Sequence, residues 1–333
     1  MKQVAVIILN WNGLELLKKF LPVAVKHTVS DKADLIVADN GSSDNSVEWI
    51  KRNFPEVKIL EFADNYGFAG GYNKAVAETD YPLTLLLNSD VEVTPGWLDP
   101  LLDYMDTHPK CAALQPKIRW QLHKELFEYA GAAGGLLDKN GYPYCRGRLF
   151  DSLEKDCGQY DAAPADVAWA SGAAMLVRTN VYKEVGGLDE DFFAHMEEID
   201  LCCRMHAAGY GVVCVPSSTV YHVGGASLAQ GNPRKTYLNF RNNLLLLHKN
   251  LPRPEGRRRL FIRRLYDTLA WGMFILKMDF RNAAAVLKAH RDFKRMRRNY
   301  TSLPASDRLR SLPGADKNII VERYLKRKKK IDL

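Results

Sequence analysis

The chain has 333 residues, 47% of them hydrophobic, and carries a formal net charge of +8. This length holds one large α/β domain of roughly 200 to 250 residues plus an appendage, and the hydrophobic content supports a sizeable core. The longest apolar run of the C-terminal part, residues 269–276, is far shorter than the roughly 20 residues that a transmembrane helix needs, which excludes a bilayer-crossing segment there.

Charge divides the chain into two parts. From Arg234 onward there are 27 Lys and Arg against 8 Asp and Glu, whereas the first 233 residues contain 20 against 31. We therefore expect a catalytic domain over residues 1–233 and a basic helical extension over residues 234–333. A basic extension on an acidic domain indicates a polyanionic surface as partner.

The cysteines and the N-terminus indicate the compartment. The six cysteines include no C-x-x-C pair and no zinc-type spacing, so reduced thiols in the cytoplasm are expected. The apolar run Val4–Leu9 is interrupted by Asn10-Trp11-Asn12 without a small-residue cleavage site. It therefore predicts a first buried strand rather than a signal peptide.

The first 95 residues alternate strand and helix patterns at the spacing of βαβ units. We predict a doubly wound, mostly parallel sheet from these elements. The expected strands are Val4–Leu9, Leu35–Ala38, Val57–Phe62 and a run ending at Asn88, and the expected helices are Leu14–His27, a stretch from the Ser43-Asp44 cap to Phe54, and Tyr72–Glu78.

The pattern is weaker after residue 95. Glycine-rich turns between Pro95 and Pro164 favour hairpins. A strand with a glycine bend is expected over Asp166–Arg178, a helix over Glu197–Ala208 and a strand over Gly211–Val215, whereas Lys326–Lys330 is expected to form a disordered basic end.

Two predicted strands end in acidic residues. The run Pro82–Leu87 stops at Asn88-Ser89-Asp90, and Leu35–Ala38 stops at Asp39. Ligands of open α/β sheets bind beyond the carboxyl ends of the strands, so both carboxylates are expected to face one crevice. Asp39 fits a nucleoside contact, although an Asx-turn is the structural alternative. Asp90 fits a divalent metal that offsets the charge of a diphosphate.

Three further sequence features could contribute to the same site as these acids. The glycine-rich stretch 65–73 lets backbone approach a ligand, yet it is not a G-x-G-x-x-G dinucleotide motif. His222 could complete a metal site or could be structural. Glu197 and Glu198 begin a predicted helix after an apolar stretch, where one of them could act as a general base or both could be solvated.

Together these motifs resemble glycosyltransferase family 2, the inverting transferases of GT-A fold, and in particular its bacterial rhamnosyltransferase-like members. The resemblance extends over roughly residues 3 to 250, with its elements in the family's order. It rests on the first strand with Asn10-Trp11-Asn12-Gly13, on Asp39-Asn40-Gly41-Ser42-Ser43-Asp44, on Asn65–Asn73, on Asn88-Ser89-Asp90, and on Gly186–Glu190 followed by Glu197–Leu201.

The resemblance implies a role for each matching residue. Asp90 and His222 would hold Mg²⁺ or Mn²⁺, and Glu198, or alternatively Glu197, would be the catalytic base. Trp169 would be an acceptor-side aromatic or a core residue. Nucleotide contacts are expected from Asn10, Asp39, Asn65, Gly67, Gly71, Asn73, Asn88 and Ser89.

The sequence departs from the family pattern at two of these positions. Asn88 replaces the first acid of the D-x-D motif, and Glu198 stands where Asp is usual, which leaves the choice between Glu197 and Glu198 open. The resemblance implies a UDP- or dTDP-sugar donor, an inverting displacement, and a hydroxyl of a cell-surface glycan or polyprenyl-linked acceptor.

The basic extension predicts the location. Arginine clusters at residues 257–259, 263–264 and 295–298 interleave with apolar and aromatic residues, as in helices that lie on anionic membranes. We expect a peripheral protein on the inner face of the cytoplasmic membrane; a helix packed on the catalytic domain is the alternative. A methyltransferase, a dehydrogenase or a nucleic-acid-binding protein would explain only part of these features, and no nucleic-acid partner is expected.

Overall fold

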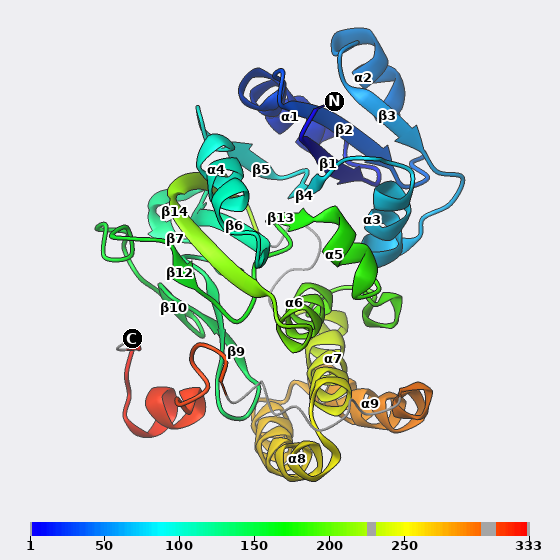
Figure 1. Ribbon diagram of the computed structural model, residues 1–333. Helices are drawn as coiled ribbons and strands as arrows, with labels where there is room; N and C mark the ends of the chain where they lie inside the picture. Colours follow the sequence, from blue (N-terminus) through cyan, green and yellow to red (C-terminus); the bar gives the residue numbers. More distant parts are fainter. Residues whose placement is uncertain (1, 225–230, 301–310, 332–333) are drawn as a thin grey trace.

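The computed structural model describes residues 2–224, 231–300 and 311–331. Its centre is a mixed sheet in the order β12-β14-β6-β13-β4-β1-β2-β3, to which β5 and β7 add by pairing with β14 and β6 (Figure 1). These strands are β1 (Val4–Asn10), β2 (Ala33–Asp39), β3 (Lys58–Glu61), β4 (Leu83–Asn88), β5 (Val91–Val93), β6 (Cys111–Trp120), β7 (His123–Phe127), β12 (Ala165–Asp166), β13 (Ala174–Arg178) and β14 (Gly211–His222).

The N-terminal half of the sheet is parallel, as predicted. β1 pairs in parallel with β2 and β4, and β2 pairs in parallel with β3. β13 then runs antiparallel between β4 and β6, so the whole sheet is mixed rather than mostly parallel. The α/β class is confirmed.

Helices cover both faces of this sheet. The helices are α1 (Leu14–Thr28), α2 (Ser46–Asn53), α3 (Gly67–Ala77), α4 (Asp99–Thr107), α5 (Thr179–Glu184), α6 (Glu197–Ala207), α7 (Pro233–Asn250), α8 (Arg253–Leu276) and α9 (Phe280–Met296), with short 3₁₀ turns η1 (Glu190–Phe192) and η2 (Arg297–Asn299). One apolar cluster holds Leu17 of α1 and Leu101 of α4, and the other holds Tyr72 of α3 and Ile199 of α6. The sheet is therefore buried between two layers of helices, which explains its continuous apolar strands.

Two boundaries differ from the prediction. Helix α3 begins at Gly67 instead of Tyr72, so the glycine-rich stretch forms its first turns. The segment expected as one strand over Asp166–Arg178 is split into β12 and β13. Between them Trp169 bridges to Gly135 outside any strand, because the local chain turns to pack on the second sheet.

The C-terminal part is not separate from the catalytic domain. A small second sheet of β8 (Gly135–Leu137), β9 (Pro143–Cys145), β10 (Arg148–Leu149) and β11 (Ser152–Leu153) lies beside it. Ile319 is buried against Leu136 and Tyr144 of this sheet, and its backbone N–H donates to Asp138. Figure 1 shows the C-terminal segment, in red, beside β9 and β10.

The basic end Lys326–Lys330 therefore follows an ordered segment, contrary to the expectation of disorder. A π-helical turn, η4 (Val321–Leu325), precedes it, and Lys326 Nζ pairs with Glu322 at 2.7 Å. The buried contacts of residues 311–320 fix this segment, and those contacts are made with residues 170 and 181 positions away.

Candidate active site

The predicted polar residues meet at the carboxyl edge of the parallel strands. In the strand register Asn10 lies opposite Asp39, and Leu9 lies opposite Asn88. Asp39 is buried, and its two carboxylate oxygens accept hydrogen bonds from Asn10 Nδ2 and from the Ser42 backbone N–H, each at 2.9 Å. Because each oxygen can accept a second bond, Asp39 retains acceptor capacity for a nucleoside donor.

An asparagine pair shapes the turn that enters α3. Asn40 Nδ2 donates to Asn65 Oδ1 and to the Gly67 carbonyl, both at 3.0 Å, and Asn65 Oδ1 accepts from the Gly67 N–H at 2.8 Å. Gly67 has φ +71°, a conformation that glycine adopts without strain. Asn65 and Gly67 thus lie at the same edge as Asp39, as expected for nucleotide contacts.

Gly71 and Asn73 have packing roles instead. A Cβ at Gly71 would lie 2.8 Å from Leu9 Cδ1, so this glycine allows α3 to approach β1 closely. The Asn73 amide donates to Leu188 O and Glu190 and accepts from Tyr182 OH and the Leu188 N–H. All four hydrogen-bonding positions of this amide are occupied, which leaves none for a nucleotide.

Asp90 and His222 come together, as the sequence predicted. Their Oδ1 and Nε2 atoms lie 3.1 Å apart, and both side chains are buried. Asn88 Nδ2 is 3.5 Å from the same histidine nitrogen. Burial opposes ionisation of Asp90, but the hydrogen bond and charge of His222 hold the pKa of this carboxyl below its usual value.

Glu128 completes this cluster from the other side of the imidazole. Its Oε1 lies 3.4 Å from His222 Nδ1, and its Oε2 accepts from the Ala130 backbone N–H. Burial lowers the pKa of His222, but the carboxylates of Glu128 and Asp90 raise it to about 10. Two carboxylates that flank one ring in this way favour positive charge between them, either a proton on the ring or a metal ion that replaces the proton on Nε2. No sequence motif selects Glu128, which lies in the irregular region after residue 95.

The pair fits a divalent ion that also binds the substrate. A carboxylate oxygen and an imidazole nitrogen 3.1 Å apart match neighbouring ligands of an octahedral ion, which binds at about 2.0–2.1 Å. A carboxylate on the far ring nitrogen is the usual partner of a metal-binding histidine. Within the described ranges no group of three or more His, Cys, Asp or Glu residues could hold a metal. Asp90 and His222 would therefore leave most coordination positions to diphosphate oxygens and water.

Glu197 and Glu198 begin α6, but they have different environments. Glu197 is buried, whereas Glu198 is partly exposed. Burial raises the pKa of both carboxyls, and the charge of Glu198 adds to the effect on Glu197. Among the described residues neither Oε2 atom has a hydrogen-bond partner. Both Oε2 atoms are themselves buried, but the Glu198 side chain as a whole is more exposed than that of Glu197, which favours Glu198 as the residue that meets an acceptor hydroxyl.

The backbone before α6 is strained. Phe193, His195 and Met196 have φ values of 64°, 68° and 74°, in the left-handed region that non-glycine residues rarely adopt. Such strain persists only where surrounding contacts impose it, and it clusters at functional sites.

Helix α7 supplies these contacts through two buried side chains. Asn242 Nδ2 donates to the carbonyls of Phe192, Ala194 and His195 at 2.7 to 2.9 Å. Arg241 Nη2 donates to the carbonyls of Asp191 and Phe192, both at 2.8 Å. The basic extension therefore holds the loop that positions Glu198.

Trp169 lies in the core. It is buried, its Nε1 donates to the Leu136 carbonyl at 2.9 Å, and a Cβ at Gly135 would lie 2.1 Å from its ring. This placement favours the structural alternative over an acceptor contact.

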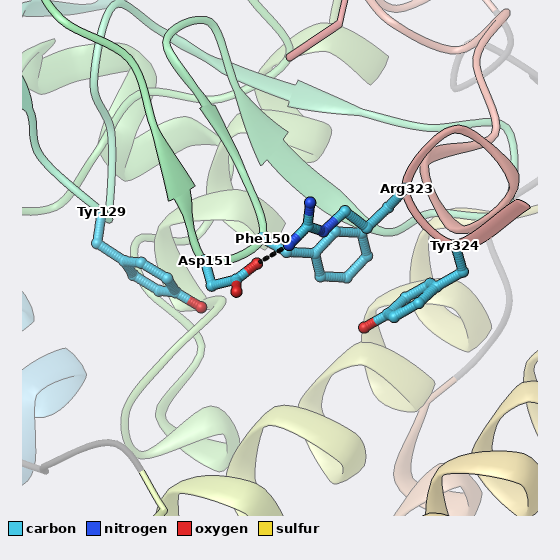
Figure 2. Close-up of a pocket in the computed structure, with 5 residues that line it drawn as sticks. All are labelled: Tyr129, Phe150, Asp151, Arg323 and Tyr324. Atoms are coloured by element: carbon cyan, nitrogen blue, oxygen red, sulfur yellow. Dashed lines mark hydrogen bonds and ion pairs between the residues drawn. The ribbon is translucent and has the colours of Figure 1, made fainter. Parts of the chain in front are cut away.

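A pocket of about 320 Å³ lies where the C-terminal segment meets the second sheet. Figure 2 shows its lining, Tyr129, Phe150, Asp151, Arg323 and Tyr324, with Arg323 Nη2 paired to Asp151 Oδ1 at 2.7 Å. Its residues come from the region between Pro95 and Pro164 and from the end of the chain. Tyr129 follows Glu128 directly, so this aromatic pocket adjoins the Asp90–His222 cluster along the chain.

The N-terminal part of the chain matches a known family. Residues 5–146 match the model of the family described as glycosyl transferase family 2. The N-acetylglucosaminyl-diphospho-decaprenol L-rhamnosyltransferase of Mycobacterium tuberculosis (strain ATCC 25618 / H37Rv) is 29% identical over 220 residues, which cover 61% of this chain and 69% of that protein. The rhamnosyltransferase WbbL of Escherichia coli (strain K12) is 39% identical over 164 residues, which cover 47% and 61%.

Solved structures show the same fold at low sequence identity. S. aureus TarS 1-349 in complex with UDP-GlcNAc has a TM-score of 0.57 at 16% identity, covering 87% of this chain and 80% of that chain. GalNAc-T7 with UDP, GalNAc and Mn²⁺ has a TM-score of 0.56 at 16% identity, covering 72% and 47%. The chain is a glycosyltransferase with a GT-A fold. Residues 5–146 match glycosyltransferase family 2, and the chain is similar to rhamnosyltransferases.

Proposed function

We propose that the chain is an inverting transferase that moves a sugar, rhamnose or a hexose, from a UDP- or dTDP-sugar to a hydroxyl of a lipid-linked or growing cell-surface glycan. The observation that carries the proposal is the placement of Asp39 and the Asp90–His222 pair at one sheet edge, with Glu198 close to the segment that enters β13: a Cβ at Gly172 would lie 3.8 Å from Glu198 Cβ. The rhamnosyltransferase relatives support the sugar class. The match to glycosyltransferase family 2 supports transfer of a sugar over the reaction of a methyltransferase or a dehydrogenase.

The residues divide the reaction between donor and acceptor sides. Asp39, held by Asn10 and Ser42, would accept hydrogen bonds from the nucleoside. Asp90 and His222 would hold Mg²⁺ or Mn²⁺, which offsets the charge that develops on the departing diphosphate. Glu128 would keep the His222 ring oriented with Nε2 toward Asp90.

Glu198 would act on the acceptor. Its carboxylate would take the proton of the acceptor hydroxyl while that oxygen attacks the anomeric carbon from the face opposite the diphosphate. The new glycosidic bond forms as the bond from the anomeric carbon to the diphosphate oxygen breaks, and the configuration inverts.

Donor hydrolysis by the purified full chain tests the donor side. UDP-, dTDP- and GDP-sugars would be assayed with Mn²⁺, with Mg²⁺ and with EDTA. We expect hydrolysis of one UDP- or dTDP-sugar that stops in EDTA, and an Asp90→Asn variant at least about 100-fold slower, because several kcal/mol of charge stabilisation are lost. Hydrolysis that EDTA and Asp90→Asn leave unchanged would contradict the proposed metal site.

Mn²⁺ binding followed by electron paramagnetic resonance separates the role of Glu128. We expect Glu128→Gln to weaken Mn²⁺ binding by about 10 to 100-fold, as the loss of a carboxylate behind a metal-binding histidine usually does. Glu125→Gln, at an exposed position nearby in the sequence, is the matched control. Equal Mn²⁺ affinities of the two variants would show that Glu128 does not orient His222.

A further inference from the structure

A second, larger pocket lies between α7 and α9, beside the strained loop. Its volume is about 710 Å³, within the range of about 300–1,000 Å³ typical of small-molecule sites. Its lining includes four basic side chains and two aromatic rings: Arg234, Arg241, Arg281, Lys288, Phe193 and Tyr237. No residue predicted from the sequence as part of the donor site lines this pocket.

Three of the four cations form no ion pair with any carboxylate in the described part of the chain. Arg234, Arg281 and Lys288 are exposed, and none of them forms an ion pair with another described residue. Arg234 and Lys288 instead lie over aromatic rings, 4.9 Å from the centroids of Phe193 and Tyr237 respectively. Arg241 is already engaged with the carbonyls of the loop. Unneutralised cations around a concave site favour an anionic ligand with several acceptor oxygens.

The pocket adjoins the donor site through a single side chain. Phe193 lines the pocket, and a Cβ at Gly67 would lie 3.6 Å from its ring. Gly67 belongs to the turn that Asn40 and Asn65 shape beside Asp39, and Glu198 follows Phe193 by five residues. A ligand in this pocket would therefore contact Phe193, which also lies beside the donor turn and belongs to the loop before α6.

Apolar residues border the cations on α9 and continue along α8. Phe280 precedes Arg281, Leu287 precedes Lys288, and both apolar side chains are more than half exposed. On α8 the exposed residues Phe261, Leu265, Leu269, Met273 and Leu276 follow one another at intervals of three or four, so they share one helix face. An anion-binding pocket bordered by exposed apolar residues matches an amphiphile whose charged group is attached to a hydrocarbon chain.

From these features we infer that the pocket between α7 and α9 binds the diphosphate group of a lipid-linked acceptor. This inference rests on the proposed function, because it assigns a place to the acceptor of the same reaction. Arg234, Arg281 and Lys288 contact the diphosphate oxygens, and the hydrocarbon chain leaves along the exposed apolar residues of α8 and α9. The acceptor sugar then extends past Phe193 toward Glu198.

Farnesyl diphosphate is a suitable probe for calorimetric binding to the full chain. EDTA is present, so that no divalent metal holds a diphosphate at Asp90. We expect Arg281→Gln/Lys288→Gln to weaken binding by about tenfold for each lost charge-assisted contact. Both side chains are exposed and neither forms an ion pair within the described part of the chain, so this variant should fold normally. Lys294→Gln/Arg298→Gln removes the same charge at exposed positions outside the pocket and should bind like the wild type.

The outcomes separate the inference from the proposed function. Equal binding by the two double variants would overturn the pocket assignment. Inorganic diphosphate that binds as tightly as farnesyl diphosphate would overturn the assignment of a lipid-linked ligand. Donor hydrolysis is measured in parallel. If a donor is hydrolysed but farnesyl diphosphate binds both double variants equally, only the inference is refuted. If Arg281→Gln/Lys288→Gln weakens binding but no donor is hydrolysed, only the proposed function is refuted.

Discussion

Two adjacent glutamates can be distinguished by their environments. Glu197 is buried in the first turn of α6, whereas Glu198 is partly exposed at the same helix start. We expect Glu198→Gln to bind the donor normally but to lose about 10² to 10⁴-fold in transfer rate, since the amide keeps the shape and cannot accept a proton. Glu197→Gln should retain most of the rate. Single-turnover rates and donor affinities of both variants check this, and an inactive Glu197→Gln beside an active Glu198→Gln would reverse the assignment.

The pH dependence follows from the same carboxyl. Burial raises the pKa of Glu198 above its usual value, and only the deprotonated form can accept the acceptor proton. Activity should therefore rise with pH, with its acidic limb at a higher pH than an ordinary glutamate would give. In Glu198→Gln this limb should disappear from the residual rate. A limb at the same pH in both proteins would assign it to another group.

At the scale of elements, helix α7 connects the basic extension to catalysis. Asn242 is fully buried and donates to three carbonyls of the loop before α6, which carries three left-handed residues. We expect Asn242→Ala to lower the free energy of unfolding by about 1–3 kcal/mol, because buried carbonyls lose their partner. The catalytic rate constant should fall more than the donor KM rises, because Glu198 follows this loop.

Urea unfolding and steady-state kinetics measure the two effects. Asn239→Ala, on the same helix at a half-buried position, is the control and should change neither. Asn242→Asp keeps the shape of the side chain and lacks its N–H donors, so it should behave like Asn242→Ala. A wild-type rate constant in Asn242→Asp would show that these hydrogen bonds do not position the base.

Some elements of the fold could be predicted from the sequence, and others could not. The strands β1, β2 and β4 were predictable because strands buried on both faces are continuously apolar, and the acids at their ends marked the crevice. The start of α3 was missed, because glycines lower helix propensity. Close packing of α3 on β1 nevertheless requires a glycine at position 71.

Other site residues depend on tertiary contacts that no local pattern encodes. Glu128 reaches His222 across 94 positions of the chain, and Asn242 reaches His195 across 47. The ordered C-terminal segment was missed for the same reason, since a lysine-rich end has the composition of a solvated tail. The local motifs therefore predicted the expected nucleotide- and metal-binding residues better than the tertiary contacts that orient the site residues.

The whole molecule has two ends of different character. Figure 1 places α1 and β1–β3 at one end and helices α7–α9 at the other. Among the residues that the structure describes, no helix has both the length and the apolar character to span a membrane. Two arginines of α8 expected on a membrane face are buried instead: Arg259 pairs with Glu255 and Arg263 with Asp267. The exposed basic residues beside the apolar face of α8 are Arg257, Arg258 and Arg264.

This arrangement predicts peripheral binding to an anionic membrane through α8. Its exposed face combines apolar residues with arginines, as interfacial helices do. Each basic residue near an anionic surface contributes about 1 kcal/mol, so reversing Arg257, Arg258 and Arg264 to Glu should weaken binding by at least about 100-fold. Arg259 and Arg263 must be left intact, because a buried charge that loses its partner destabilises the fold.

Cosedimentation with phosphatidylcholine vesicles that contain 30 mol% phosphatidylglycerol, roughly the charge density at which basic segments bind, measures this association. Wild-type binding should fall as salt rises and should be lost on pure phosphatidylcholine, because the attraction is screened within about 10 Å at 0.1 M salt. Reversing Lys18, Lys19 and Lys26, exposed residues of α1 at the opposite end, changes the net charge equally and should have a much smaller effect. If the two triple variants lose binding to the same extent, overall charge rather than α8 governs the association; if neither loses it, the apolar face of α8 is not a membrane surface.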